Sequence, residues 1–219
     1  MTLYCSVGGK RVFAAGIDIP WRGIWTADLL LPEELPAALR AGKLTLVIAG
    51  LSLVGTIVRG ADFEGDFKAR MVGGAGGWRR TIAARAYQSA AGLRLGPILK
   101  DAAREAGEEI VVSEDRVVGQ FFIRAKDIAS RTLDALYPDW WVDTAGRAQI
   151  AARAEPVVAT AFDLLSFDPA RGRYEIATEH PESFAPGAKF TSPTTAQAQA
   201  SLVCHRLTEG KLRTVVYAA

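Results

Sequence analysis

Cysteine and histidine are scarce in this sequence. The 219 residues include two cysteines, Cys5 and Cys204, near opposite ends of the chain, and two histidines, His180 and His205. Two cysteines so far apart form no zinc-binding pair, and a single possible bridge is no disulfide framework, so a reducing compartment is the expected setting. The sequence therefore predicts neither a bound metal nor a cofactor.

Long apolar runs are missing too. The longest, residues 44–58, has 15 residues, fewer than the roughly 20 that a membrane-crossing helix requires. The run is rich in β-branched residues and is broken by Gly50 and Gly55, which predicts two buried strands. The first residues, MTLYCSVGGKRVF, lack the basic and apolar regions of a signal peptide. We expect a protein made in the cytoplasm without a membrane partner.

A strong charge of one sign is also absent. Basic and acidic residues number 26 and 24, a net charge of +2, which by itself favours neither nucleic acid nor a membrane surface as a partner. Arginine outnumbers lysine, which suits bidentate contacts at protein interfaces but is equally what a GC-rich genome produces.

Strand patterns dominate the rest. Runs of alternating or apolar residues with turn residues at short spacing fill the N-terminal part, and hairpin patterns fill the C-terminal part. The C-terminal hairpins turn at 143–146, 168–172 and 209–210. The fold class predicted is mainly β with a helical insertion (α+β), built on two small β-barrel-like domains. The predicted units are a barrel-like domain over 1–90, a helix and hairpin insertion over 91–154, and a barrel-like domain over 155–219.

Two helices are predicted in the insertion, with a short helical turn near residues 31–42. The first, over 93–108, has apolar residues at three- and four-residue spacing and ends at Gly107. The second, over 125–141, begins with Asp127 as its N-cap and ends at Pro138. The apolar stripes consist of Ile98, Leu99, Ala102, Ala103 and Ala106 in the first helix and Ile128, Ala129, Thr132, Leu133 and Leu136 in the second.

The stretch MVGGAGGWRR, residues 71–80, resembles a phosphate-binding loop at first sight. A P-loop requires a lysine and a Ser or Thr at the start of a helix, whereas Trp78, Arg79 and Arg80 follow here and a strand pattern resumes. The dinucleotide pattern also fails, because Arg79 occupies the place of its third glycine. We interpret the glycines as a flexible connection able to lie against a neighbouring chain.

Other chemical motifs are weak. Ser52 lies in GLSLVG, which lacks the spacing and the following helix of a nucleophile elbow. Asp62, Glu64 and Asp66 alternate, which in a strand would place three carboxylates on one face; that face could hold Ca²⁺ or Mg²⁺, but more often is simply solvated. No catalytic set emerges, so the sequence predicts a binding or structural protein and not an enzyme.

Tryptophan supplies the candidate interface residues. Trp140 and Trp141 are adjacent in a predicted strand, so their side chains point to opposite faces, and only one can enter the core. The other is a candidate for a subunit contact or is covered within the same chain. Trp78, Arg79 and Arg80 complete the candidate interface set.

The order of these pieces resembles the baseplate hub proteins of phage tails, a group that includes Mu-like tail proteins and the late control protein D family. The resemblance covers about residues 45–219 and is carried by three stretches: AGLRLGPILKDAAREAGEEI, then IRAKDIASRTLDALYPDWWVDTAGRAQIA, then the FAPGAKFTSP and LVCHRLTEGKLRTVVYA segments. The chain is shorter than typical hub proteins, and its first 20 residues match no part of that pattern.

This resemblance implies a homotrimeric ring in which each chain supplies two similar barrels. The ring would act as a symmetry adaptor. On one side it would meet the six-fold tail tube or a distal tail protein, and on the other a three-fold central spike. The tape measure protein is a further implied neighbour. The implied location is the tail tip or baseplate of the virion. A barrel that binds single-stranded nucleic acid is the main alternative, since small barrels often present aromatic and arginine side chains to single strands. A cell-wall hydrolase is a third reading, for which the crowded acids at 62–66 and at Glu108 and Glu109 would have to supply a carboxylate pair.

Overall fold

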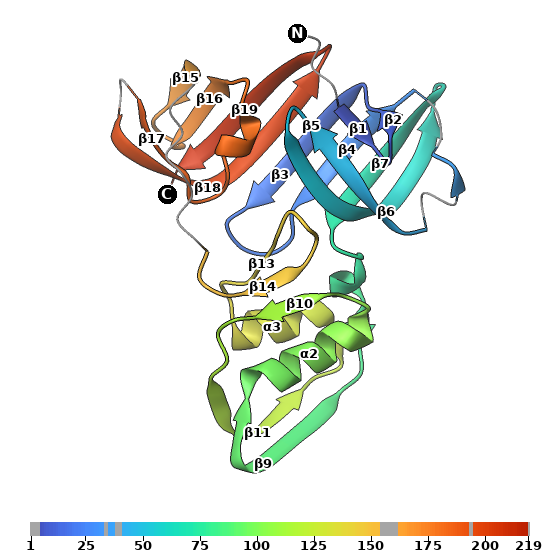
Figure 1. Cartoon of the computed structure of the whole chain (residues 1–219), viewed down its shortest axis with the longest axis vertical. Helices are drawn as coiled ribbons and strands as arrows, with labels where there is room; N and C mark the ends of the chain where they lie inside the picture. The colour runs from blue at the N-terminus through green and yellow to red at the C-terminus, as the bar shows by residue number, and fades with distance from the viewer. Residues whose placement is uncertain (1–4, 33–34, 38–40, 154–161, 193–194, 219) are drawn as a thin grey trace.

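The computed structural model describes residues 5–32, 35–37, 41–153, 162–192 and 195–218. The chain is mainly β with a helical insertion, as predicted. Figure 1 shows two β-rich units side by side and a third, helix-containing unit that extends away from them. The helical turn predicted near residues 31–42 lies partly outside the described residues, at 33–34 and 38–40. Neither described helix combines the length and the apolar run needed to cross a membrane.

The N-terminal unit is an antiparallel arrangement of seven strands. They are β1 (Cys5–Val7), β2 (Lys10–Arg11), β3 (Ala14–Pro20), β4 (Thr26–Leu31), β5 (Lys43–Ile48), β6 (Leu51–Phe63) and β7 (Asp66–Gly73). The apolar run 44–58 forms β5 and most of β6, which confirms the two predicted strands. Alternate residues of β4 and β5 are buried, so each strand turns one face to the core.

The C-terminal unit continues the same sheet. Its strands are β15 (Asp163–Asp168), β16 (Arg173–Ala177), β17 (Lys189–Ser192), β18 (Thr195–Thr208) and β19 (Lys211–Ala218). β18 pairs with β3 in antiparallel register from Leu202↔Pro20 to Leu207↔Ala15. The sheet order is β15-β16-β19-β18-β3-β4-β7-β6-β5-β1-β2, with β17 beside β18. The path of the described strands is open, so these strands close no barrel in either unit.

Tight turns join neighbouring strands. Residues 49–50, 64–65 and 209–210 each form a two-residue turn in which both residues have positive φ, the type I′ geometry that matches strand twist. The turn at Glu64-Gly65 separates β6 from β7, so Asp62 and Asp66 lie on different strands. The prediction that Asp62, Glu64 and Asp66 share one strand face is therefore wrong.

The insertion carries both helices and several short strands. Its elements are η1 (Gly77–Arg79), β8 (Thr81–Ile82), β9 (Arg85–Arg94), α2 (Leu95–Ala106), β10 (Ile110–Val112), β11 (Val117–Arg124), β12 (Asp127–Ile128), α3 (Ala129–Leu136), β13 (Trp141–Val142) and β14 (Ala148–Ile150). A second 3-10 turn, η2 (Pro181–Ser183), lies in the C-terminal unit. β8 and β9 pair with β12 and β11, so strands that precede residue 90 belong to the sheets of the insertion.

Helix α2 confirms its prediction and α3 corrects one detail. All five predicted stripe residues of α2 are buried, and Gly107 ends the helix with φ 74°, the left-handed conformation that glycine adopts most easily. In α3, Ile128 and not Asp127 is the N-cap. The Asp127 carboxylate accepts from the adjacent amide of Ile128. Ile128 is exposed, while the other four stripe residues are buried.

Two hydrophobic clusters fill the molecule. The larger one joins the N-terminal unit to both helices, and a smaller aromatic-rich cluster lies inside the C-terminal unit. The smaller cluster includes Phe184 and Phe190 packed edge-on.

The three hairpins predicted near the C-terminus are all present, at β13–β14, β15–β16 and β18–β19.

Candidate functional site

The glycine stretch after β7 binds an anion of its own chain. The Glu108 carboxylate accepts hydrogen bonds from the backbone N–H groups of Ala75 (2.9 Å), Gly77 (2.5 Å) and Trp78 (3.2 Å). Successive N–H groups that converge on one point form an anion-binding concavity. The phosphate-like appearance of this stretch thus reflects a real anion site, which an internal carboxylate fills.

Several of these glycines are required by close packing inside the chain. A Cβ atom on Gly77 would lie 1.9 Å from the carbonyl oxygen of Ala106, and one on Gly73 would lie 2.6 Å from Nε1 of Trp25. Gly74 has φ 80° and packs against Gly146 of the β13–β14 turn. The interpretation of this stretch as a flexible connection lying against a neighbour is therefore replaced by a tightly packed joint between β7, α2 and the β13–β14 hairpin.

Glu108 carries the electrostatic consequence of this burial. Burial raises the pKa of Glu108 above its ordinary value of 4.5, and the N–H groups of Ala75, Gly77 and Trp78 partly offset that rise. The adjacent Glu109 points to solvent and pairs with Lys43 at 2.5 Å. The two acids therefore have separate roles and do not form the carboxylate pair of a hydrolase.

Trp78 and Trp140 form a buried pair. Their ring centroids are 5.9 Å apart, and both side chains are almost wholly buried. The Nε1 atom of Trp140 donates to Asp134 of α3 at 2.8 Å. Neither side chain reaches the surface of the chain, so both stabilise the interior of the insertion and are not exposed contacts for a partner.

Trp141 and the two arginines lie differently. Trp141 is half-buried, with the guanidinium of Arg153 4.2 Å from its ring centroid, so the face opposite Trp140 is partly covered within the chain. The sequence predicted that one of the two tryptophans enters the core, and Trp140, which precedes β13, is the buried one. Arg79 and Arg80 are exposed beside η1. Of the five candidate interface residues, Arg79, Arg80 and in part Trp141 are accessible.

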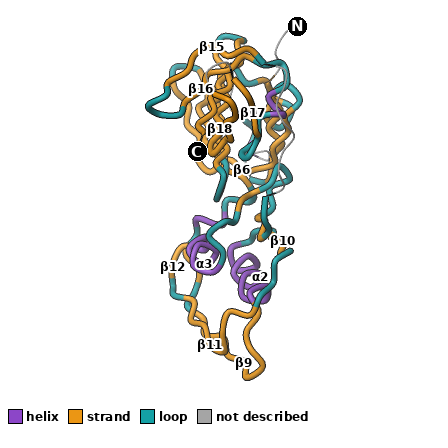
Figure 2. The backbone as a smooth tube through the Cα atoms, turned by 90° about the vertical axis from the view of Figure 1, so that its left-hand side faces the viewer, coloured by secondary structure: helices purple, strands orange, loops and turns teal. Residues whose placement is uncertain are grey.

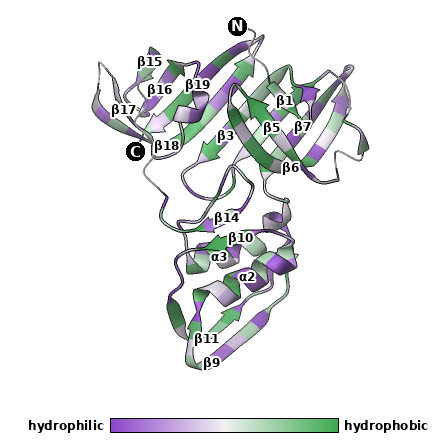
Figure 3. Cartoon of the chain, in the orientation of Figure 1, coloured by the Kyte–Doolittle hydropathy of each residue, from purple (hydrophilic) through white to green (hydrophobic). Residues whose placement is uncertain are grey.

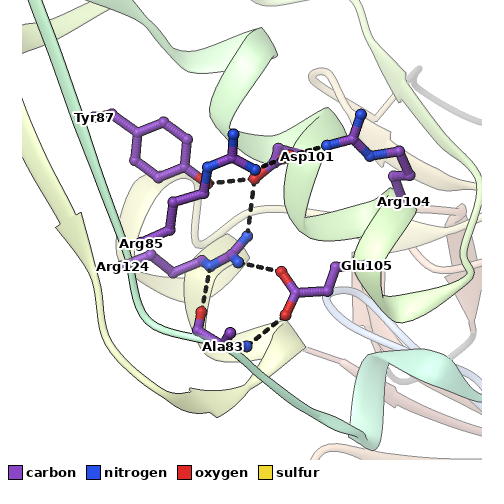
Figure 4. A network of polar contacts seen from close by, with 7 residues as sticks. All are labelled: Ala83, Arg85, Tyr87, Asp101, Arg104, Glu105 and Arg124. Atoms are coloured by element: carbon purple, nitrogen blue, oxygen red, sulfur yellow. Dashed lines mark hydrogen bonds and ion pairs between the residues drawn. The ribbon is translucent and has the colours of Figure 1, made fainter.

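A network of charged side chains fastens the β9–β11 ribbon to α2, as Figure 4 shows. Arg124 of β11 is 2% exposed and contacts Glu105, Asp101 (3.4 Å) and the carbonyl oxygen of Ala83 (3.1 Å). Asp101 also accepts from Arg85 and from the Tyr87 hydroxyl, both at 2.7 Å. A buried guanidinium held on several sides is costly to displace, so the ribbon has a fixed position on the helix.

The opposite end of the molecule carries a groove on the shared sheet. It has a volume of about 840 Å³ and crosses β18, β3, β4, β7 and β6. Small residues such as Gly16 lie in it beside the ion pair between Arg70 and Asp28 (2.9 Å). Arg206 pairs with Asp18 of β3 at 2.6 Å. The groove therefore spans the junction of the two β units, where their strands meet.

The candidate catalytic residues are not assembled. His205 is fully buried and its Nδ1 atom lies 3.0 Å from the Thr214 hydroxyl, while exposed His180 lies beside Glu182. Ser52 lies in strand β6, and no helix follows it. Among the described residues, no three His, Cys, Asp or Glu side chains gather where they could hold a metal ion.

Solved structures with the same fold are tail and secretion-system proteins. The prophage MuSo2 43 kDa tail protein from Shewanella oneidensis has a TM-score of 0.69 at 11% identity, over 99% of this chain and 97% of that one. A tail protein from Neisseria meningitidis has a TM-score of 0.67 at 12% identity, over 100% and 96%. A component of the E. coli type VI secretion system, described as structurally similar to the T4 bacteriophage tail proteins gp27 and gp5, has a TM-score of 0.67 at 9% identity, over 98% and 76%.

These likenesses extend over the whole chain and define a shared fold at very low identity. No protein-family model matches the sequence, and no curated protein matches it closely. The comparisons therefore show that this chain shares its fold with phage tail proteins and with a component of a type VI secretion system.

The sequence pointed to the tryptophans but missed Arg124 and the exposed face of the ribbon. It named Glu108 only among the crowded acids of a hydrolase and not as the partner of the glycine loop. Glu108 follows Gly107 in an ordinary helix-end pattern, and its amide partners lie about 30 residues upstream. The β-branched and aromatic residues in VVGQFFIR (117–124) were a usable signal for a strand.

Proposed function

We propose that this protein is a structural component of a phage or phage-like tail, and that it forms the hub of the baseplate at the tail tip. The observation that supports this most strongly is the whole-chain similarity in fold to three tail and secretion-system proteins. Agreement over 98–100% of this chain includes both β units and the helical insertion in one arrangement.

In the proposed assembly, three copies form a ring and each contributes two barrel-like units. Three chains then present six similar β units, which can meet a six-fold tail tube or distal tail protein on one side. The same ring offers three equivalent positions to a three-fold central spike on the other side, and the tape measure protein is a further candidate neighbour. Such an adaptor works by surface complementarity and needs no catalytic residue, no metal and no cofactor.

The continuous sheet supports this role. The β18–β3 pairing joins the two β units through backbone hydrogen bonds, so they hold a constant relative orientation without depending on a flexible linker. A ring whose six units must match a six-fold partner requires that fixed relationship.

The accessible candidates Arg79, Arg80 and Trp141 belong to the insertion, which we propose as part of the contact surface. The single-stranded nucleic-acid alternative is not favoured, because the similar structures are tail and secretion-system proteins.

Labelled electron microscopy of tails tests this proposal. Antibody fragments raised against the purified chain and coupled to gold are applied to tail particles from producing cells. We expect gold at one end of the tail, and loss of that label when the fragments are first absorbed with the purified chain. Tails that carry no label, while the chain is found only outside particles, would contradict the proposal.

A further inference from the structure

The most exposed apolar surface of the molecule lies on one strand. Val117, Phe121 and Ile123 are 57%, 58% and 60% exposed, and no other large apolar side chain of the described chain is as exposed. All three lie on β11. Phe121 and Ile123 are separated by the half-buried Phe122, so they lie on one face of the strand, and register shifts next to Gly119 separate Val117 from them. Figure 3 shows this apolar strand at the end of the insertion farthest from the two β units.

The ribbon that carries this surface has two open edges. Within the described part of the chain, β9 and β11 pair only with each other, in antiparallel register. Each strand therefore has one row of backbone N–H and C=O groups facing outward. Figure 2 shows the ribbon extending beyond both helices. A two-stranded ribbon with an apolar outer face is marginal in water on its own.

Several usual protections of an edge strand are missing here, although β11 has register shifts on either side of Gly119. Neither strand contains proline, lysine or an acidic residue, which are the residues that discourage edge-to-edge pairing. The three arginines of the ribbon are already neutralised within the chain: Arg85 by Asp101, Arg94 by Asp115, and Arg124 by Glu105 and Asp101. These ion pairs reduce the charge repulsion that an approaching identical ribbon would meet.

The geometry points to a second copy of this chain as the occupant. In a ring, β11 of one copy can pair with β9 of the next, and because β9 and β11 run in opposite directions, every new pair is again antiparallel. Such a head-to-tail contact forms a closed ring when the rotation between copies divides a full turn evenly, and an open filament otherwise. With the three copies of the proposed function, on which this step depends, six strands would form a small closed barrel.

Side-chain sizes fit that arrangement. On the outer face of the ribbon, large side chains of β11 face small or polar ones of β9, with Ile123 opposite Ala86 and Phe121 opposite Gln88. Alternation of large and small residues fills the interior of small barrels. The inner face already packs on the protein core through Tyr87 and Phe122. We infer that β9 and β11 of neighbouring copies pair edge to edge, with Val117, Phe121 and Ile123 buried at the centre of the ring.

The test uses the full-length chain and two readouts. Light scattering after size exclusion gives the oligomeric state, and hydrogen exchange at low and high protein concentration gives the protection of amides in 85–94 and 117–124. We expect those amides to gain protection as oligomer forms. We also expect Phe121→Lys and the milder Ile123→Thr to weaken association, on the order of tenfold for the lysine variant.

Leu165→Lys is the matched control, because Leu165 is 48% exposed on β15 in the other unit; it should leave association unchanged. Circular dichroism checks that each variant is folded. Hydrogen exchange of the unsubstituted chain tests the ribbon contact even if a variant does not fold. If Phe121→Lys still forms the oligomer and the amides of 85–94 and 117–124 gain no protection, the ribbon contact is overturned. The proposal that three copies form a ring would not be contradicted by that result. A chain that stays monomeric at every soluble concentration overturns self-pairing, while gold labelling of tails still decides the proposed function separately.

Discussion

The Oε1 atom of Glu108 lies 2.5 Å from the backbone nitrogen of Gly77, and this contact joins the end of α2 to the loop that follows β7. The carboxylate replaces the partners that three loop amides would otherwise find in water. Because α2 also carries the ion network of the ribbon, the contact links the shared sheet to the far end of the insertion.

Replacing Glu108 by glutamine tests this joint. A glutamine amide places an N–H group where an acceptor is needed, so loop N–H groups lose their partner. We expect Glu108→Gln to lower the free energy of unfolding by roughly 1–3 kcal/mol, as measured by urea denaturation. Glu109→Gln is the control, because Glu109 lies at the surface beside Lys43, and should cost less than about 1 kcal/mol. Equal effects of the two variants would contradict the role given to Glu108.

Gly77 tests the packing of the same loop. A Cβ there would meet the Ala106 carbonyl oxygen at 1.9 Å, whereas a Cβ on Gly42 meets nothing within 4 Å. We expect Gly77→Ala to destabilise the chain by more than about 2 kcal/mol, since two packed backbone segments must separate, and Gly42→Ala to have little effect. Thermal unfolding of both variants measures the difference. A Gly77→Ala protein as stable as Gly42→Ala would show that the loop is loose.

Asp101 gives the ion network a pH dependence. Burial opposes the ionisation of Asp101, but the Tyr87 hydroxyl and Arg85, Arg104 and Arg124 outweigh it, so its pKa lies below the ordinary 3.8. A carboxyl whose folded pKa is lowered stabilises the protein above its unfolded pKa, and this contribution disappears as pH falls through the folded pKa.

We therefore expect Asp101→Asn to cost about 2 kcal/mol near pH 7, with the gap to the unsubstituted protein narrowing as pH falls below about 4. Denaturant unfolding at a series of pH values measures it. Asp139→Asn, at an exposed pair with Arg22, is the control. A gap that stays constant down to the most acid pH would contradict the account.

His205 predicts a second pH effect at milder acidity. Burial first, and then the charge of Arg206, lower the pKa of His205 to about 4 from 6.5. Between pH 6.5 and about 4, His205 is therefore protonated in the unfolded chain and neutral in the folded chain. Stability from this group is present above pH 6.5 and is lost as pH falls toward 4, by up to about 3 kcal/mol.

We expect His205→Gln to remove most of that pH dependence between pH 7 and 4.5, as measured by urea midpoints. His180→Asn, at an exposed histidine, should retain it. If both variants keep the same slope as the unsubstituted protein, His205 does not titrate in the way its burial implies.

Local patterns predicted the elements of this fold well. The amphipathic stripe and Gly107 gave the first helix, and turn residues gave the three C-terminal hairpins, because these signals act within a few residues. Asp127 failed as an N-cap because the helix begins one residue later than predicted, with Ile128 as its N-cap, and the Asp127 carboxylate binds the amide of Ile128. The acidic cluster failed because Glu64-Gly65 forms a turn.

The candidate site was harder to predict because its contacts are distant in sequence. The partner of the glycine loop is a carboxylate 30–33 residues downstream, and the sequence offers no rule for that pairing. Trp78 and Trp140 were predicted as candidate interface residues, and only the structure shows that their rings pack against each other in the interior. The continuous sheet depends on β18 pairing with β3 across more than 180 residues.

Rotational symmetry tests the central claim most directly. Electron microscopy of the assembled chain, with averages computed without imposed symmetry, should show a three-fold ring with six β units around its axis. Averages with two-fold or no rotational symmetry, or tails that contain a single copy, would contradict the hub.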